Sequence, residues 1–152
     1  MRVNERRAIR LTDDEAAELL AAGGKLQLAT INPDGTPHLV TMYYAVVDGR
    51  IAFWTYRTSQ KARNLERDPR VTCLIEAGDD YFTLRGLQVN GVVQPTDDPV
   101  AVAEIGARVV AGSLGLPADQ LDGYVAYTAP KRRGYLVEPV RTVSWDHRKL
   151  AQ

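Results

Sequence analysis

The chain has 152 residues, 45% of them apolar, and this length predicts one domain with its own core over residues 1–152. Nineteen basic side chains balance nineteen acidic ones, so no overall positive field attracts nucleic acid or an anionic membrane. A single cysteine excludes an internal disulfide. One cysteine and two histidines are also few ligands for a metal centre. No apolar run approaches the length of a membrane span and no signal-like segment opens the chain, so a cytoplasmic protein is expected.

A helix is expected over about residues 12–22. Thr12 and Glu15 stand at the spacing of a capping box, in which the hydroxyl and the carboxylate each accept a hydrogen bond from a free backbone N–H. Gly23 and Gly24 follow, and glycine readily adopts the left-handed conformation that ends a helix. The first expected element is therefore a short helix that precedes all of the strands.

Hydrophobic alternation begins at Lys25 and predicts three strands in succession. The first ends at a turn sequence over residues 32–35, and its return strand covers residues 36–47. Asp48-Gly49, a strong hairpin signal, joins this strand to a third over residues 50–56. In the return strand, apolar residues occupy both sets of alternating positions and therefore both faces, so we expect both faces to be covered.

The second half of the chain adds three more strands and two helical segments. Strands are expected over residues 70–77, 81–94 and 134–143, the second of them bent at internal glycines. A short helix of residues 60–68 precedes them, and a helical insert occupies about residues 98–129. Six strands in largely sequential hairpins predict a mainly β fold, an antiparallel barrel with peripheral helices.

The sequence contains no motif for covalent or metal-assisted hydrolysis, and no catalytic residue is identified. It has neither a glycine-rich nucleotide loop, nor a zinc-binding HExxH, nor a nucleophile elbow. His38 and His147 stand in no motif, and Cys73 lies in mid-strand, where a small buried hydrophobe is expected. Hydrolytic enzymes of these classes are therefore unsupported.

The junction between the third strand and the short helix is the most informative segment for binding. Arg57 and Ser59 precede a helix start whose free N–H groups and positive dipole end favour an anion. Lys61 stands in the first turn, where a cation costs about 0.3 to 1 kcal/mol unless a bound anion reverses the sign. A solvated surface helix explains the same residues equally well, so the chemistry alone leaves both interpretations open.

The run Lys61–Val71, preceded by Gly35–Val40, resembles the split β-barrel family of pyridoxamine-phosphate-oxidase-like flavoproteins. The similarity covers about residues 24–91 and, more loosely, the final strand. Within this family, the same run together with Ser144–Leu150 most resembles the actinobacterial branch that uses the deazaflavin coenzyme F420. The resemblance implies a six-stranded antiparallel split β-barrel and a homodimer with the cofactor at the interface.

The resemblance also implies which positions bind the cofactor. The ring is expected along the stretch from Leu39 to Tyr44 and at the end of the third strand, and the phosphate at Lys61. Gln60 stands where the family has a second basic residue, and Arg57 could supply the lost charge. The implied cofactor-binding residues are Leu39, Val40, Thr41, Met42, Tyr44, Trp54, Thr55, Arg57, Ser59, Gln60, Lys61, Arg85 and Trp145.

Several of these residues also have a simpler structural explanation. An aromatic residue such as Trp54 or Tyr44 is more often part of a core or a dimer contact than of a cofactor site. The fifth strand offers Gln88 as an alternative to Arg85, and Trp145 is expected to close the site from the other subunit. A partner subunit would also cover the outside of the apolar return strand.

The resemblance implies an F420-dependent oxidoreductase that transfers hydride between the deazaflavin and an unsaturated or quinone-like small molecule. Two alternatives stay open: an FMN-dependent oxidoreductase of the same fold, and a module that binds a flavin or tetrapyrrole without turnover. F420 carries an acidic tail, for which Arg57, Arg63 and Arg67 are candidates, whereas FMN needs only the phosphate site. Oxidation of pyridoxamine phosphate is less well supported because the terminal arginine-rich substrate motif is missing.

Overall fold

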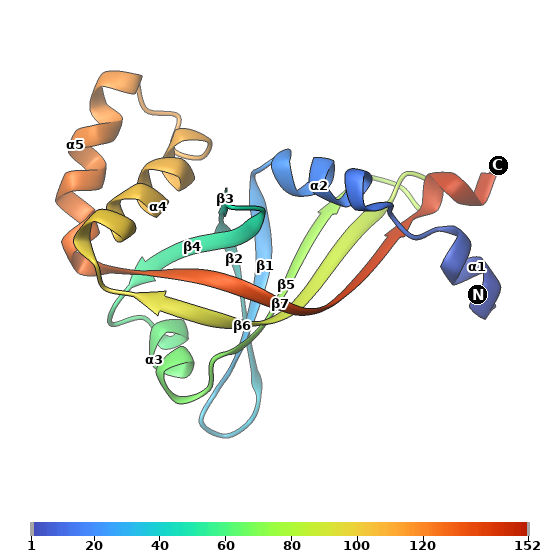
Figure 1. Ribbon diagram of the computed structural model, residues 1–152, viewed down its shortest axis with the longest axis horizontal. Helices are drawn as coiled ribbons and strands as arrows, with labels where there is room; N and C mark the ends of the chain where they lie inside the picture. The colour runs from blue at the N-terminus through green and yellow to red at the C-terminus, as the bar shows by residue number, and fades with distance from the viewer. Residues whose placement is uncertain (1, 152) are drawn as a thin grey trace.

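Seven antiparallel strands form one strongly curled sheet in the computed structural model, which describes residues 2–151 (Figure 1). The strands are β1 (Lys25–Ile31), β2 (Pro37–Tyr43), β3 (Ala45–Val47), β4 (Arg50–Tyr56), β5 (Arg70–Ala77), β6 (Arg85–Thr96) and β7 (Arg132–Asp146). Their order across the sheet is β2-β1-β5-β6-β7-β4-β3. This confirms the predicted fold, a mainly β split barrel with peripheral helices.

The predicted count of six strands is wrong because the return strand is interrupted at Tyr44. The Tyr44 side chain is buried, and its hydroxyl donates a hydrogen bond of 2.6 Å to the carbonyl oxygen of Leu20. Before this residue β2 pairs with β1, and after it β3 pairs with β4. The two edge strands of the sheet are thus separated in the sequence by Tyr44 alone, and the two edges of the curled sheet come near each other at this residue.

The β3–β4 hairpin has the geometry that its turn residues predict. Asp48 and Gly49 have positive φ angles of 51° and 73°, as a two-residue type I′ turn requires. Both β4 and β5 begin and end at the predicted residues. The strand boundaries in this half of the sheet are therefore encoded locally.

β2 is covered on only one face within this chain. Val40 and Met42 are partly buried against the core, whereas Leu39 is 65% exposed and Tyr43 41% exposed on the other face. The predicted cover on both faces is therefore not provided by the chain itself.

β6 and β7 are the longest strands, and both bend where glycine allows a close approach. Gly91 lies opposite Pro139 while Asn90 lies opposite Arg141, so Val140 is an extra residue that bulges outward. β7 is longer at both ends than the predicted strand of residues 134–143. The bulge gives the pair the bend that the glycines predicted.

β6 begins four residues later than predicted. Tyr81, Phe82 and Thr83 form a turn instead, in which the backbone N–H groups of Thr83 and Leu84 both donate to the carbonyl oxygen of Asp80. The aromatic pair of this turn is exposed, so its hydrophobicity is not a sign of a buried strand.

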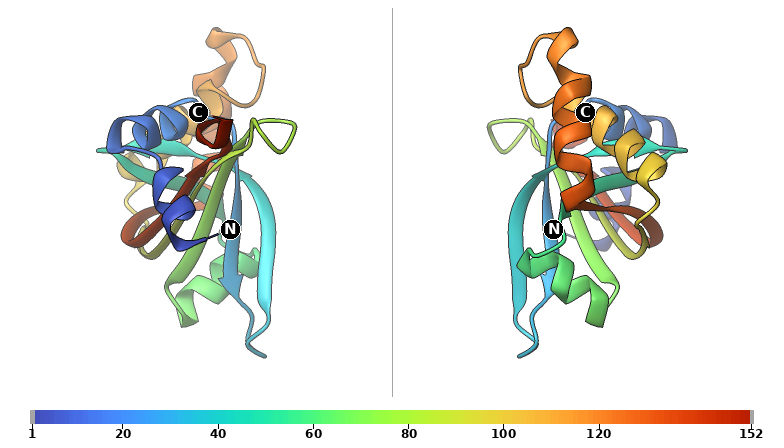
Figure 2. Two further views of the ribbon diagram at one scale, coloured as in Figure 1. Left: turned by 90° about the vertical axis from the view of Figure 1, so that its right-hand side faces the viewer. Right: turned by 90° about the vertical axis from the view of Figure 1, so that its left-hand side faces the viewer.

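The helices are α1 (Val3–Ala8), α2 (Asp13–Ala21), α3 (Gln60–Arg67), α4 (Pro99–Ala111) and α5 (Ala118–Thr128), with 3-10 turns at Ala129–Lys131 and His147–Ala151. α3 and the α4–α5 hairpin lie toward one end of the sheet and α1 at the other, whereas α2 packs against the central strands β5 and β6; the curl of the sheet is seen end-on in Figure 2. The predicted capping box starts α2, the predicted insert is the hairpin of α4 and α5, and α1 was not predicted. Across residues 2–151, every helix is too short or too polar to span a bilayer.

Two hydrophobic clusters form the core. The larger fills the curled sheet and includes Phe53 and Tyr135, whose rings stack with centroids 5.0 Å apart. The smaller lies between β4 and the α4–α5 hairpin, with Trp54 at its centre. A Cβ atom at Gly106 of α4 would lie 2.2 Å from the Trp54 ring, so this glycine allows the helix to rest directly on the indole. Trp54 is thereby fixed in place beside the end of β4.

Cys73 is fully buried in the larger cluster, and burial raises the pKa of its thiol to about 12. The thiol therefore stays protonated near neutral pH, and we expect the native protein to resist a thiol-specific reagent at pH 8 while the urea-denatured chain reacts completely. Because the chain has a single cysteine, mass spectrometry of the labelled protein measures this directly. Rapid labelling of the native state would contradict the burial of this side chain.

Candidate functional site

The junction between β4 and α3 is a well-fixed helix start. The Ser59 hydroxyl caps α3 by accepting a hydrogen bond of 3.2 Å from the Ala62 N–H, and it lies 3.3 Å from the buried Thr55 hydroxyl. Ala62 and Leu65 are buried and hold the helix against the sheet. The first turn of α3, with Lys61, is therefore held at a defined place beside the end of β4.

A buried polar network ties α3 to the hairpin of β1 and β2. Asn64 is fully buried, and its amide nitrogen donates at 3.0 Å to the side-chain oxygens of Thr30 and Asn32. Its amide oxygen accepts from Gln60 at 2.9 Å and from Arg67 at 3.5 Å. Gln60, a predicted cofactor-binding residue, thus takes part in the anchoring of the helix.

Lys61 is a half-buried cation that makes no hydrogen bond or ion pair with any residue between positions 2 and 151. Burial, and after it the positive charge of Arg132, lower the pKa of its ammonium group. Both effects penalise the charged form, and a bound anion would offset both. This combination favours the binding-site interpretation of the junction over a merely solvated helix.

Arg132, at the start of β7, is the neighbouring cation and packs over two aromatic rings. Its guanidinium carbon is 4.5 Å from the ring centroid of Trp54 and 4.1 Å from that of Tyr56. Its Nε donates a hydrogen bond of 3.0 Å to the Thr128 hydroxyl. Within the described chain no carboxylate pairs with it, so the Lys61–Arg132 pair is a concentration of uncompensated positive charge.

The other basic residues of the junction already have partners. Arg57 forms an ion pair of 2.7 Å with Asp97 of the β6–α4 loop. Arg63 donates at 2.8 Å to the carbonyl oxygen of Thr58, and Arg67 donates to a backbone carbonyl of β1. Of the cations predicted to hold a phosphate or an acidic tail, only Lys61 is therefore left without a partner in the described structure.

A cavity of about 190 Å³ opens beside Arg132, between β2, β4 and the α4–α5 hairpin. Three residues predicted to contact the cofactor ring meet there, namely Thr41, Met42 and Trp54. The rest of the lining consists of Tyr43, Val109, Val110, Ser113, Leu114, Tyr124 and Arg132. Arg132 is the one cation in this largely apolar lining, and Lys61 lies outside the lining but close enough to Arg132 to be affected by its charge. Such a cavity has the chemistry needed for a flat ring joined to an anionic group.

The other predicted residues of the β2 stretch lie outside this cavity lining. Leu39 points outward and is mostly exposed, whereas Val40 faces the core. Tyr44 is buried and bonded to the backbone of α2, so its hydroxyl has a structural role.

Arg85 and Trp145 lie at the opposite end of the sheet. Arg85 begins β6 and Trp145 is close to the end of β7, whereas Arg132 starts β7 (Figure 1). A Cβ atom at Gly86 would lie 2.1 Å from the indole of Trp145, so the ring rests on this glycine. A single chain therefore does not bring these two residues to Lys61.

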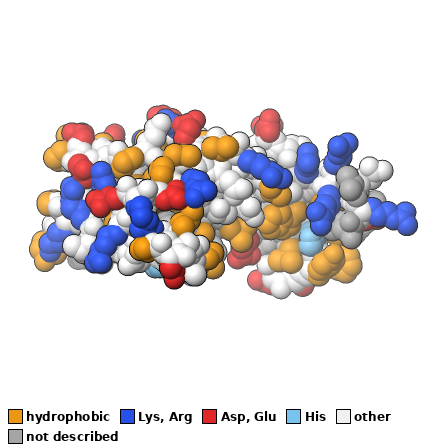
Figure 3. Space-filling view, turned by 90° about the horizontal axis from the view of Figure 1, so that it is seen from below, with side chains coloured by type: hydrophobic (Ala, Val, Ile, Leu, Met, Phe, Trp, Pro, Cys, Tyr) orange, Lys and Arg blue, Asp and Glu red, His pale blue; other side chains and the backbone are white. Residues whose placement is uncertain are grey.

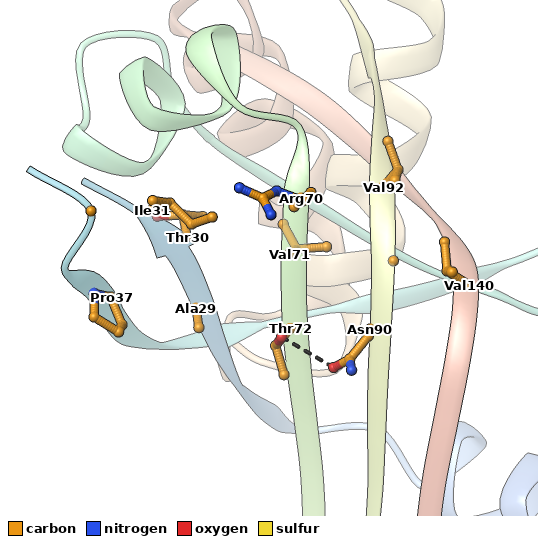
Figure 4. Close-up of a pocket in the computed structure, with 12 residues that line it drawn as sticks. Ala29, Thr30, Ile31, Pro37, Arg70, Val71, Thr72, Asn90, Val92 and Val140 are labelled. Carbon is orange, nitrogen blue, oxygen red and sulfur yellow. Dashed lines mark hydrogen bonds between the residues drawn. The ribbon is translucent and has the colours of Figure 1, made fainter. Parts of the chain in front are cut away.

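A wider hollow of about 520 Å³ lies over β1, β5 and β6, but its lining offers few polar groups that are free to bind a ligand (Figure 4). The Thr72 hydroxyl donates there to the side-chain oxygen of Asn90 at 3.1 Å. The charged side chain in its lining, Arg70, is paired with Asp68 at 2.7 Å, which lowers the pKa of that carboxyl to about 2. With its polar groups paired in this way, the hollow is a weaker candidate than the cavity beside Arg132.

Sequence reasoning missed Arg132 as a site residue. Trp54 and Tyr56, which hold it, precede it by about eighty residues, and only the pairing of β4 with β7 brings them together. The run Lys131-Arg132-Arg133 was the one available signal, and it does not indicate which of the three basic side chains faces the cavity.

The curled antiparallel sheet and its charged strand-to-helix junction define a split-barrel protein. The chain belongs to the pyridoxamine 5'-phosphate oxidase family, because the model of that family matches residues 12–145. No curated protein matches the chain significantly.

Solved structures of similar proteins agree with this assignment. The conserved hypothetical protein Rv2991 from Mycobacterium tuberculosis is 43% identical, with 97% of this chain and 92% of that chain covered and a TM-score of 0.89. A structure named F420 reductase is 28% identical over 82% of this chain and 93% of that chain, with a TM-score of 0.61. HutZ, the heme storage protein from Vibrio cholerae, shares the fold at 16% identity, with 87% of this chain and 94% of that chain covered and a TM-score of 0.67.

Proposed function

We propose that the chain is an F420-dependent oxidoreductase acting on an unsaturated or quinone-like small molecule. The observation that carries this proposal is Arg132, a cation without a carboxylate partner in the described structure, in the lining of a cavity that also contains Thr41, Met42 and Trp54. Lys61, whose pKa the charge of Arg132 lowers, is the second cation of the proposed site. A deazaflavin bound there would supply the hydride. The 28% identity to a structure named F420 reductase supports this choice of cofactor over FMN.

In this proposal the protein contributes position and electrostatics. Lys61 and Arg132 hold the cofactor's phosphate, and the rings of Trp54 and Tyr56 keep the guanidinium from turning away. The apolar side of the α4–α5 hairpin, including Leu114, keeps water from the cavity and favours an apolar acceptor. A proton can come from solvent or from a tyrosine hydroxyl in the cavity lining.

Titration of the purified protein with F420, FMN and haem tests the proposal. We expect saturable changes in the absorption and fluorescence of F420, with weaker or no binding of the other two. Stopped-flow mixing of the protein, reduced F420 and a soluble quinone is then expected to show faster oxidation of F420 than without protein. Tight binding of FMN alone would favour an FMN-dependent enzyme, and binding of any of the three without faster transfer would favour a storage or carrier module.

We also propose that the chain forms a homodimer through the outer face of β2. This edge strand exposes Leu39 and Tyr43, and burial of apolar side chains of this size is worth about 1.5 to 3 kcal/mol each. Leu39→Asp is expected to shift sedimentation from dimer to monomer at micromolar concentration. The exposed Val100 of α4 lies outside this face, so Val100→Asp is the control and is expected to leave the dimer intact. A wild-type protein that sediments as a monomer would contradict the proposal.

A further inference from the structure

A second cavity, of about 590 Å³, lies at the end of the molecule opposite to α3. It is formed by α1, the segment that follows α1, and the end of β7. Its lining residues are Arg6, Ile9, Arg10, Leu11, Arg141, Thr142, Val143, Ser144, Trp145 and His147. The proposed cofactor site uses none of these residues except Trp145, and only through a partner subunit.

The wall of this cavity is built by specific hydrogen bonds. The Asp146 N–H donates at 2.7 Å to the carbonyl oxygen of Ile9, and the Leu11 N–H donates at 3.1 Å to the Ser144 hydroxyl. The segment between α1 and α2 is thus docked along the end of β7. Trp145 belongs to β7, and its indole is fixed by close contact with Gly86 of the neighbouring strand β6.

Three arginines line the cavity, and the described structure gives their side chains no partner. Arg6 and Arg10 come from the N-terminal segment and Arg141 from β7, and none of their guanidinium groups makes a hydrogen bond or ion pair within residues 2–151. Figure 3 shows basic side chains gathered at this end of the molecule. The cavity therefore concentrates positive charge in a chain whose formal net charge is zero.

The nearby acidic groups are already used by other cations. Asp146 pairs with Arg148 at 2.7 Å, and Glu15 pairs with Lys149 at 2.6 Å. Both carboxylates also accept backbone hydrogen bonds. The charge of the three lining arginines is left for a ligand to balance.

We propose that this cavity binds a small organic or inorganic anion with two or more phosphate or carboxylate groups. Guanidinium groups bind both chemistries through paired N–H donors, and the concave shape suits a compact ligand better than an extended polymer. Trp145 forms part of the wall, so its fluorescence reports occupancy of the cavity. Within one chain the arginines lie at the far end of β7 from Lys61, so the proposal rests on residues other than the cations of the proposed cofactor site.

Fluorescence of Trp145 in a Trp54→Phe background tests the proposal, with pyrophosphate and citrate as probes at constant ionic strength. We expect a saturable change with at least one probe, and the stronger of the two identifies phosphate or carboxylate as the preferred chemistry. Arg6→Gln and Arg141→Gln are each expected to weaken binding at least about tenfold. Arg7→Gln, on the same helix but outside the cavity lining, is the matched control and is expected to leave binding unchanged.

If the Trp54→Phe variant does not fold, calorimetric titration of a Lys61→Ala chain with its natural Trp54 replaces the fluorescence measurement, because Lys61→Ala is expected to weaken phosphate binding at the proposed cofactor site. Lys61→Ala is expected to leave pyrophosphate or citrate binding at this cavity intact, which separates it from the proposed cofactor site. Absence of saturation with both probes, or an equal loss in Arg7→Gln, would overturn the proposal.

Discussion

Alanine in place of either Lys61 or Arg132 is expected to weaken binding of F420 by about 10- to 100-fold. A hydrogen bond to a charged group contributes about 1.5 to 3 kcal/mol, and tenfold in affinity corresponds to about 1.4 kcal/mol. The loss is measured by fluorescence titration of the cofactor. Lys131→Ala is the matched control, because Lys131 adjoins Arg132 in sequence but packs on Tyr127, 4.1 Å from the ring centroid, outside the cavity lining.

Stability measurements separate a binding role of Lys61 from a structural one. Burial and the charge of Arg132 both disfavour the Lys61 ammonium group, so Lys61→Met is expected to make the cofactor-free protein more stable. The same variant is expected to bind F420 poorly. A destabilised Lys61→Met protein, or one that binds F420 with undiminished affinity, would remove Lys61 from the proposed site.

The lowered pKa of Lys61 also gives binding a pH dependence of defined sign. A bound phosphate favours the ammonium form, so the pKa of Lys61 is higher in the complex than in the free protein, where burial lowers it. Affinity therefore falls as the pH rises through the lowered pKa of the free protein. Titrations at rising pH are expected to show this fall below 10.5, the ordinary pKa of lysine, and the Lys61→Arg variant is expected to lack it because arginine stays charged.

Replacement of Asn64 by leucine is expected to destabilise the fold by about 2 to 4 kcal/mol. Leucine has a similar shape but makes none of the four hydrogen bonds, and each buried polar group left without a partner costs about 1 to 3 kcal/mol. The buried Thr30 hydroxyl loses its donor in this variant. Urea denaturation followed by circular dichroism measures the change.

Gln60→Ala is the control for the Asn64→Leu variant. Gln60 is exposed and contributes one hydrogen bond to the network, so its loss is expected to cost less than about 1 kcal/mol. Equal midpoints for Asn64→Leu and the unmodified protein would show that the network does not hold α3 in place.

Elements defined by neighbouring residues were predictable from the sequence. Asp48-Gly49 fixes a tight hairpin, Asp68-Pro69 ends α3, and Thr12 with Glu15 starts α2, because each signal acts within one turn of the chain. The extra strand was not predictable, because the break at Tyr44 depends on a hydrogen bond to α2. The start of β6 was predicted four residues too early because the exposed aromatic residues Tyr81 and Phe82 give the preceding turn the hydrophobicity of a strand.

The candidate site was predictable where it lies within one segment and not where it joins distant ones. The place of Lys61 in the first turn of α3 follows from Ser59 and the local sequence. The partners of the other cations are long-range: Arg57 meets Asp97 in the β6–α4 loop, and Arg132 meets the rings of β4. Charge complementarity between segments so far apart becomes visible only once the sheet has closed.

The long-range pairing of β4 with β7 has a consequence for the order of folding. β1 with β2, β3 with β4, and β5 with β6 are hairpins that form from neighbouring residues, whereas Phe53 meets Tyr135 only when β4 pairs with β7 across about eighty residues. Bringing such distant segments together carries the largest entropic cost, so this pairing is expected to limit the refolding rate. Because Arg132 reaches the rings of β4 through that same pairing, the proposed anion-binding pair of Lys61 and Arg132 is expected to form only in this slow phase of refolding.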